Sequence, residues 1–190
     1  MSTADANGMM VSFIQSNYAG FGSGVVVPGT GISMQNRGFG FTTEEGHQNQ
    51  VAGGKRPFHT IIPGFAMKNG APLMAYGMMG GPIQAMGHLQ LLLRTQLWEQ
   101  DVQTAADAPR WRTIEGLDVA CEPSMGADLL EGLRRLGHRI EVEAPDNAFG
   151  FGGAPLIACP PECGYLAGSA PVPYNPLMPR TSGLAWSRGG

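Results

Sequence analysis

Two glycines stand directly before a proline that begins a long apolar-periodic stretch, and this junction constrains the fold more than any other feature. Gly80 and Gly81 precede Pro82, and apolar residues then recur every three or four positions as far as Leu97. Proline is favoured at the first helical position, so the pattern predicts a helix over residues 82–100. The first amides of a helix lack intrahelical partners and carry partial positive charge. The junction therefore predicts backbone N–H groups that face an anion or a developing oxyanion, which glycine lets approach closely.

Two further segments accompany the junction. A glycine-rich run covers residues 20–31, and a basic segment covers residues 55–60. Taken alone, the glycines of the run fit ordinary turns, and a Gly-Gly-Pro junction fits a plain turn before a helix. The presence of all three segments in one chain favours the functional interpretation of the junction.

Composition narrows the class of protein. The chain has 190 residues, enough for one domain with a substantial core. Its formal net charge of −3 gives no reason to expect nucleic-acid binding. No apolar run approaches the roughly 20 residues of a membrane span, and no secretory leader is visible, so the compartment is not indicated. Only 14% of the residues are charged, against about 25% in typical domains. We therefore expect part of the surface to be covered, either by a partner chain or by a further part of the same chain.

The three cysteines do not indicate a disulfide framework. Their number is odd, and no secretory leader accompanies them. Cys159 and Cys163 have a spacing that would suit a metal, but no second Cys or His pair of suitable spacing follows. We expect neither a metal site nor a cofactor.

Turn signals and periodicity predict a mixture of helices and mostly antiparallel strands. The expected strands cover residues 9–15, 25–27 (short and buried), 59–67, 72–78 and 138–142. The expected helices cover residues 82–100, 101–107 and 123–136. Asn7 and Gly8 predict a hairpin turn, although few residues precede it to form the first strand. Residues 68–70 predict a second hairpin turn, between the expected strands at 59–67 and 72–78. Residues 42–54 predict a surface loop. The composition indicates an α/β layered domain over residues 1–154 and an irregular Pro/Gly-rich tail over residues 155–190.

The glycine-rich run, the basic segment and the Gly80–Gly81 pair occur in an order that resembles the small subunit of γ-glutamyltranspeptidases. The resemblance extends to their cephalosporin-acylase-like branch and covers roughly residues 3–153. Other positions that look like family motifs are Phe21, Gly22, Gly24, Gly29, Gly31, Asn36, Lys55, Arg56, Pro57, Asp107, Pro109 and Arg110. The resemblance implies half of the four-layer αββα sandwich of N-terminal-nucleophile hydrolases. It also implies a self-cleaving precursor and a threonine nucleophile whose own α-amine acts as the base. That threonine would cleave a γ-glutamyl (glutathione-type) or related acyl amide through an acyl-enzyme.

The resemblance also assigns roles to individual residues. The N–H groups of Gly80 and Gly81 match the oxyanion hole, and Ser16 matches a hydroxyl that supports the nucleophile. The residues placed in substrate binding are Tyr18, Arg37, His59 and Thr60. Gly40 falls where the transpeptidases have an aspartate that pairs with the substrate α-amine, and this difference favours the acylase-like branch.

Structural interpretations stay open beside these roles. Tyr18 also fits a packing aromatic, Arg37 an ion-pair partner or surface charge, and His59 a structural histidine. The hydroxyl of Ser16 also fits a turn hydrogen bond. The histidines expected to be structural are His47, His88 and His138.

The resemblance places the threonine nucleophile a few residues before Ser2. We therefore expect the chain to lack it and to have little activity alone. Ser2 or Thr3 acting as an exposed N-terminal nucleophile is a lesser alternative. The expected partners are the large subunit of the same family and a small-molecule amide. One alternative is a non-catalytic or degenerate subunit that binds a large-subunit partner, and another is an acylase whose true start lies upstream of Met1.

Overall fold

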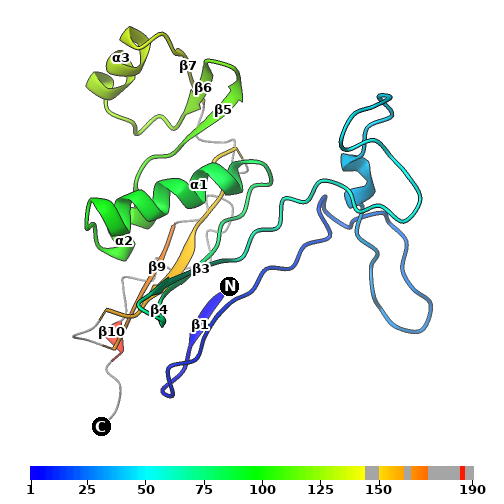
Figure 1. The fold of residues 1–190 in the computed structure, drawn as a ribbon, viewed down its shortest axis with the longest axis horizontal. Coiled ribbons are helices and arrows are strands. Elements are labelled where there is room, and N and C mark those ends of the chain that lie inside the picture. The colour runs from blue at the N-terminus through cyan, green and yellow to red at the C-terminus, as the bar shows by residue number, and fades with distance from the viewer. Residues whose placement is uncertain (144–149, 161–163, 171–184, 187–190) are drawn as a thin grey trace. The chain divides into compact units, whose positions relative to one another are not determined.

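The chain folds as two units (Figure 1). The computed structural model describes residues 1–143, 150–160, 164–170 and 185–186. The first unit, called the main unit, comprises Met1–Phe13 and the residues from Ile62 onward. The second, called the middle unit, comprises Ile14–Ile61.

A five-stranded antiparallel sheet forms the centre of the main unit, with the strand order β10-β9-β8-β4-β3. Its strands are β3 (Gly64–Lys68), β4 (Ala71–Tyr76), β8 (Pro155–Ala158), β9 (Tyr165–Ser169) and β10 (Ala185–Trp186). β3 and β4 form the predicted hairpin, and both turn residues, Asn69 and Gly70, have positive φ angles of 52° and 78°. Antiparallel pairing throughout this sheet confirms the predicted fold class.

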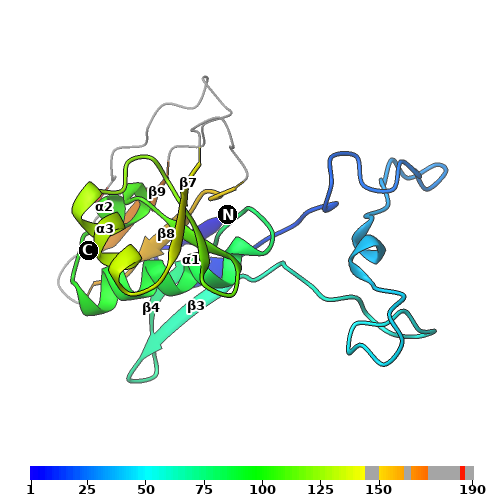
Figure 2. The ribbon, with the colours of Figure 1, turned by 90° about the horizontal axis from the view of Figure 1, so that it is seen from above.

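Two helices cover one face of this sheet (Figures 1 and 2). These are α1 (Ile83–Leu92) and α2 (Val102–Asp107), and α2 packs against β8 and β9. Gln103 of α2 fixes this contact, because its side-chain amide exchanges two hydrogen bonds with the backbone of Ser169, at 3.0 and 3.2 Å. α2 begins at Asp101, whose carboxylate accepts hydrogen bonds from the backbone N–H groups of Gln103 and Thr104.

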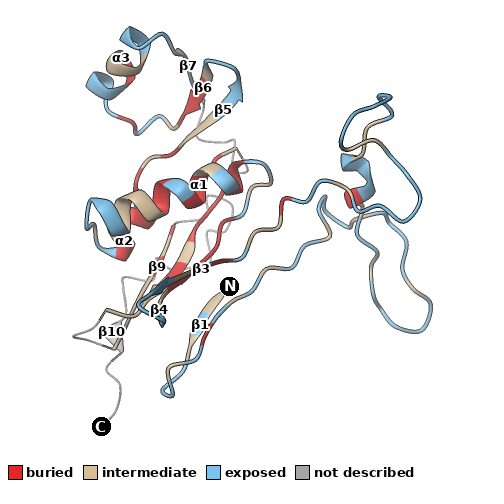
Figure 3. Ribbon diagram, viewed as in Figure 1, coloured by how far each residue is buried: buried red, intermediate tan, exposed pale blue. Residues whose placement is uncertain are grey.

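The apolar core lies between the helices and the sheet, as the buried residues in Figure 3 show. Met74, Ile83, Leu91 and Leu156 are each at most 2% exposed. Burying a side chain of this size contributes roughly 1.5–3 kcal/mol. Two residues of the expected apolar stripe lie outside this core: Leu89 is 50% exposed and Leu97 is 65% exposed.

The predicted helix over residues 82–100 is correct only for its first part. After Leu92 the helix widens into a π turn over Leu93–Leu97, where Trp98 N–H donates to the carbonyl of Leu93. Arg94 in this turn donates to the carbonyl of Pro109 at 3.2 Å. The helix therefore ends in a π turn that is hydrogen-bonded to the segment following α2.

A second, three-stranded sheet carries its own small core. It comprises β5 (Trp111–Glu115), β6 (Asp118–Cys121) and β7 (Arg139–Val142). β6 and β7 are parallel, and α3 (Ala127–Arg135) connects them. Val119, Cys121, Met125 and Leu130 form the buried cluster of this sheet. Gln90 of α1 joins the two sheets of the main unit, because its side-chain amide exchanges two hydrogen bonds with the backbone of Trp111, at 2.8 and 3.1 Å.

The N-terminal hairpin is present, and the expectation that its first strand lacks residues is wrong. β1 (Ser2–Ala4) pairs with β2 (Met10–Ser12) across the predicted turn. Three residues are enough for this strand because the hairpin packs on β4 and β8, on the side away from α1 in Figure 1. Ser12 Oγ donates to the carbonyl of Tyr76 at 2.7 Å, which fixes the hairpin to β4.

The irregular tail expected from residue 155 is wrong for two segments, because β8 and β9 lie inside the central sheet. Proline is tolerated as the first residue of a strand, and Leu156, which follows Pro155, is only 1% exposed. Residues 161–163, 171–184 and 187–190 lie outside the described residues.

The middle unit consists mainly of turns and extended chain, with a 3₁₀ turn over Arg37–Gly40. The expected buried strand at residues 25–27 is absent. Val26 forms a single bridge with Ser33, and Val25 and Val26 are more than half exposed. Residues 42–54 are a loop, as predicted. The fully buried residues of this unit are Arg37 and Thr60, and both are polar (Figure 3).

The buried histidine of α1 predicts a pH-dependent stability. His88 is 7% exposed, its ring packs edge-on against Tyr76 at 5.0 Å, and Nε2 has no hydrogen-bond partner among the described residues. Burial lowers the pKa of His88 below its ordinary value of 6.5. The unfolded chain therefore binds a proton at His88 more readily than the folded chain does. The stability of the folded state consequently decreases as the pH falls below about 6.5.

We expect the free energy of unfolding to decrease through the interval from pH 6.5 down to the lowered pKa of His88. His88→Phe keeps a ring against Tyr76 and should reduce this decrease. Urea unfolding of both proteins between about pH 5 and 7.5 measures the difference. Identical pH dependence in the two proteins would contradict the assignment to His88.

Candidate active site

The loop that joins β4 to α1, residues 77–81, carries the predicted oxyanion-binding donors and is called the glycine loop. Gly80 and Gly81 have φ angles of 111° and 68°, which residues other than glycine rarely adopt. Pro82 caps α1 without a side-chain hydrogen bond. Neither Gly80 nor Gly81 donates its backbone N–H to an acceptor among the described residues. The loop thus presents two unpaired donors at the positive end of α1.

Space is available beside these donors. A Cβ atom built on Gly81 would meet no atom within 4 Å, and both glycines are half-buried. A small polar group can therefore reach the loop without displacing a side chain.

Backbone hydrogen bonds to residues 153–155, at the start of β8, hold the glycine loop in place. Gly77 N–H donates to the carbonyl of Pro155, and Met79 N–H donates to that of Gly153, each at 3.0 Å. These bonds continue the β4–β8 pairing into the loop. Gly152 has a φ of 64°, and a Cβ there would lie 1.9 Å from the carbonyl oxygen of Met79. Only glycine therefore fits at this contact.

Met78 locks the loop to α1. It is 2% exposed, and its sulfur occupies the notch left by Gly87, where a Cβ would lie 1.7 Å from Sδ. The strand, the sulfur contact and the start of α1 together fix the direction of the loop amides.

The middle unit brings together three of the four residues predicted to bind substrate. Arg37 Nη1 donates to Thr60 Oγ1 at 3.0 Å, and the Arg37 guanidinium lies 5.3 Å from the ring centre of Tyr18. Tyr18 has a positive φ of 78°, and its N–H donates to Ser16 Oγ at 2.9 Å. We call Ser16, Tyr18, Arg37 and Thr60 the arginine cluster.

Arg37 is a buried cation without a counter-ion. It is 6% exposed, and no carboxylate of the described residues lies within ion-pair distance of it. A buried charge is costly unless it is paired, and one hydroxyl and one ring offset this cost only in part. The cluster therefore suits a carboxylate ligand, which a guanidinium binds with two hydrogen bonds.

His59 lies apart from these contacts. Its side chain is exposed, and Nδ1 accepts a hydrogen bond from Ile61 N–H at 3.2 Å. This bond stabilises the local turn, which is the structural role that the sequence left open.

Ser2 and Thr3 lie inside β1, where Thr3 pairs with Val11, and the terminal amine of Met1 donates to the carbonyl of Phe13. This pairing does not favour either residue as a nucleophile.

Sequence reasoning missed Gly152, whose close contact with Met79 shapes the loop. The signal for it was the glycine pair at residues 152–153. In the part of the chain that the structure describes, no group of three or more His, Cys, Asp or Glu side chains is placed to bind a metal, and no helix is long and apolar enough to cross a membrane.

Comparisons with known proteins identify the family to which the chain belongs. Residues 1–172 match the model of the gamma-glutamyltranspeptidase family. The chain is 40% identical over 162 residues to the oxamate amidohydrolase proenzyme of Klebsiella pneumoniae, a match that covers 81% of this chain and 30% of that protein. A cephalosporin acylase structure from Bacillus halodurans is 46% identical with a TM-score of 0.82, and the match covers 100% of this chain and 34% of that one. The chain thus spans about a third of the length of these relatives.

The fold has a further match in a solved structure of acivicin-inhibited gamma-glutamyltranspeptidase. Its TM-score is 0.78 at 23% identity, and the match covers 92% of this chain and 98% of that chain. The mixed α/β fold with mostly antiparallel sheets is therefore that of the N-terminal-nucleophile hydrolases. With a family match over 172 of its 190 residues, the chain belongs to the γ-glutamyltranspeptidase family.

Proposed function

We propose that this chain supplies the oxyanion-binding loop and the acyl-group site of an enzyme that cleaves γ-glutamyl or related acyl amides. The observation that carries the proposal is the uncapped start of α1, where the backbone N–H groups of Gly80 and Gly81 have no acceptor among the described residues. Such donors stabilise the negative charge of a tetrahedral intermediate, often the largest single contribution to catalysis of acyl transfer.

The reaction proceeds in two steps. A threonine hydroxyl attacks the amide carbon, its proton passes to the threonine α-amine, and the carbonyl oxygen becomes an oxyanion that accepts hydrogen bonds from Gly80 and Gly81. The amine portion of the substrate then leaves with this proton, and the acyl group stays on the threonine. Water or a second amine then attacks the acyl-enzyme and takes the acyl group. The resemblance places that threonine a few residues before Ser2. We propose that activity also needs a large subunit of the family.

The arginine cluster supports an acyl group that carries a carboxylate. Within the described residues Arg37 has no carboxylate partner, and Thr60 adds a hydroxyl beside its guanidinium. Tyr18 contributes the ring over which the guanidinium lies, Ser16 supports the nucleophile, and His59 remains a candidate contact at the edge. Gly40 offers no carboxylate for a substrate amine. The oxamate of the relative's name is likewise an amide that carries a carboxylate and no separate amine.

We propose a large subunit of the same family as the partner, corresponding to the part of the relatives that this chain does not match. The chain matches almost the whole of one chain of a gamma-glutamyltranspeptidase structure, which suits a separate small subunit. Large apolar side chains of the middle unit are left exposed by the described residues: Phe21, Val25, Val26, Ile32, Phe39 and Phe58. We propose that a large subunit covers them. The unpaired donors of the glycine loop argue against the alternative of a purely non-catalytic subunit.

The substitution Arg37→Met tests the acyl-group site. In the enzyme assembled from this chain and a large subunit, we expect KM for γ-glutamyl-p-nitroanilide to rise about 10- to 100-fold, because a charge-assisted hydrogen-bond pair is lost. Steady-state kinetics of the assembled enzyme, with the chain alone as the blank, provide the measurement.

A matched control is available in the same unit. Arg56→Met removes the same charge from an exposed side chain and should leave KM unchanged. Equal KM values for Arg37→Met and Arg56→Met would exclude Arg37 from substrate binding. Full activity of the chain alone would instead contradict the proposed need for a partner.

A further inference from the structure

We propose that Arg110 is a positioning residue for the glycine loop, acting through the segment of residues 151–153. The inference rests on the proposed function of that loop. Arg110 touches neither Gly80 nor Gly81, so its effect passes through Gly152 and Met79.

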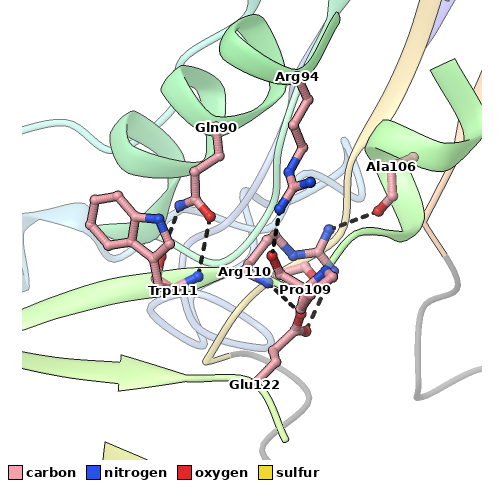
Figure 4. A network of polar contacts seen from close by, with 8 residues as sticks. Gln90, Arg94, Ala106, Pro109, Arg110, Trp111 and Glu122 are labelled. Carbon is pink, nitrogen blue, oxygen red and sulfur yellow. Dashed lines mark hydrogen bonds and ion pairs between the residues drawn. The ribbon is translucent and has the colours of Figure 1, made fainter. Parts of the chain in front are cut away.

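The Arg110 side chain joins three separate parts of the main unit. It is 7% exposed, and Nη1 donates to the carbonyl of Ala106 at the end of α2, at 3.2 Å (Figure 4). Nη2 donates to the carbonyl of Gly152 at 3.4 Å. Nη2 also lies 3.6 Å from Glu122 Oε1, while the backbone N–H of Arg110 donates to Oε2 at 2.7 Å. The guanidinium thus holds α2, residues 151–153 and the end of β6 together.

The segment that Arg110 holds is the one that backs the glycine loop. Gly152 packs so closely on the carbonyl of Met79 that no side chain fits, and Gly153 accepts the N–H of Met79. Phe151, 5% exposed, anchors the other end of the segment in the core, and Arg112 lies 5.8 Å from its ring centre. A displacement of Gly152 would therefore move Met79 and with it the donor of Gly80.

The planar fork of arginine suits this position better than an ammonium group would. Two carbonyls and one carboxylate lie around one side chain, and a guanidinium presents several N–H donors in fixed directions. Arg94 lies nearby and donates to the carbonyl of Pro109, the residue before Arg110 (Figure 4). Its pKa is lowered by burial and by the charge of Arg110. Glu122 offsets part of this repulsion.

The substitution Arg110→Lys tests the proposal in the full chain. Lysine keeps the charge beside Glu122 but cannot hold both carbonyls. We expect hydrogen exchange of the Met79 amide to accelerate roughly 10- to 100-fold, the change expected when a hydrogen bond from a charged donor is lost. The amide of Cys159, which donates to the carbonyl of Leu73 at the far end of the β4–β8 pairing, should change much less. Residue-resolved NMR exchange measures both amides.

Arg94→Lys is the matched control, because Arg94 belongs to the same network but does not contact Gly152. It should leave the Met79 amide unchanged. Equal acceleration of the Met79 and Cys159 amides by Arg110→Lys, or equal effects of the two substitutions, would overturn the proposal.

Kinetics of the assembled enzyme separate this inference from the proposed function. If the glycine loop binds the oxyanion, Arg110→Lys lowers kcat and leaves KM nearly unchanged. A loosened Met79 amide with unchanged kcat supports the positioning role of Arg110 and contradicts the oxyanion role of the loop. An unchanged Met79 amide contradicts the positioning role whatever the kinetics.

Discussion

Replacing Gly80 with proline in the assembled enzyme is expected to lower kcat about 10²–10³-fold, the loss typical of removing one oxyanion donor. Proline has no N–H, and its φ near −65° is far from the 111° of Gly80, so the donor disappears and the loop turns away from its present course. Because the change acts on the transition state, KM should move much less than kcat. Steady-state hydrolysis of γ-glutamyl-p-nitroanilide provides both constants.

Two controls separate the lost donor from general damage. Gly81→Ala keeps its N–H and adds a Cβ where no atom lies within 4 Å, so it should cost only the strain of a positive φ, about 1–2 kcal/mol. Gly116→Pro changes another glycine of positive φ, 53°, in the turn between β5 and β6 and should leave kcat unchanged. A kcat for Gly80→Pro within a few-fold of the parent enzyme would remove this loop from the mechanism.

The substitution Gly152→Ala is expected to cause the largest loss of stability among the glycine changes, roughly 2–5 kcal/mol. The added Cβ would lie 1.9 Å from the carbonyl oxygen of Met79, and the φ of 64° adds strain. Both atoms that collide belong to the backbone or are fixed to it, so rotation of a side chain cannot relieve the contact. Urea unfolding of the full chain measures the change in the free energy of unfolding.

Gly168→Ala provides a comparison in β9, two strands away from β4 in the central sheet. Its Cβ would lie 2.6 Å from the carbonyl oxygen of Val102, and we expect a destabilisation of roughly 1–3 kcal/mol. In the assembled enzyme, Gly152→Ala should also lower kcat per folded molecule, whereas Gly168→Ala should not. If the two variants lose kcat equally, the contact at Met79 has no special part in catalysis.

The elements that the sequence predicted well are those with local signals. Asn69 and Gly70 mark a hairpin whose turn needs positive φ angles, and Pro82 marks the start of α1. The strands β8 and β9 carry no such signal, because prolines surround them and their apolar residues acquire meaning only beside β4. Strand pairing in the tertiary structure therefore outweighed the local tendency of proline-rich sequence to be irregular.

The candidate site likewise contains residues with a local sequence signal and contacts without one. Gly80 and Gly81 were recognisable because a helix start leaves amides unpaired wherever it occurs. The contact between Arg37 and Thr60 joins residues 23 positions apart, and the bond from Arg110 to Gly152 spans 42 positions. Spacing along a chain does not reveal such contacts, so the resemblance suggested the first, and the structure was needed for the second.

The fully buried residues of the middle unit, Arg37 and Thr60, have a consequence for how the enzyme forms. A segment of chain that buries no large apolar side chain receives little hydrophobic driving force of its own, while the loss of conformational freedom on ordering is undiminished. If a large subunit covers this unit as proposed, its association supplies that free energy, and the net affinity between the two subunits is lowered by the same amount. Under the proposed function, the acyl-carboxylate site then becomes ordered together with subunit docking, so that an unassembled chain does not sequester substrate.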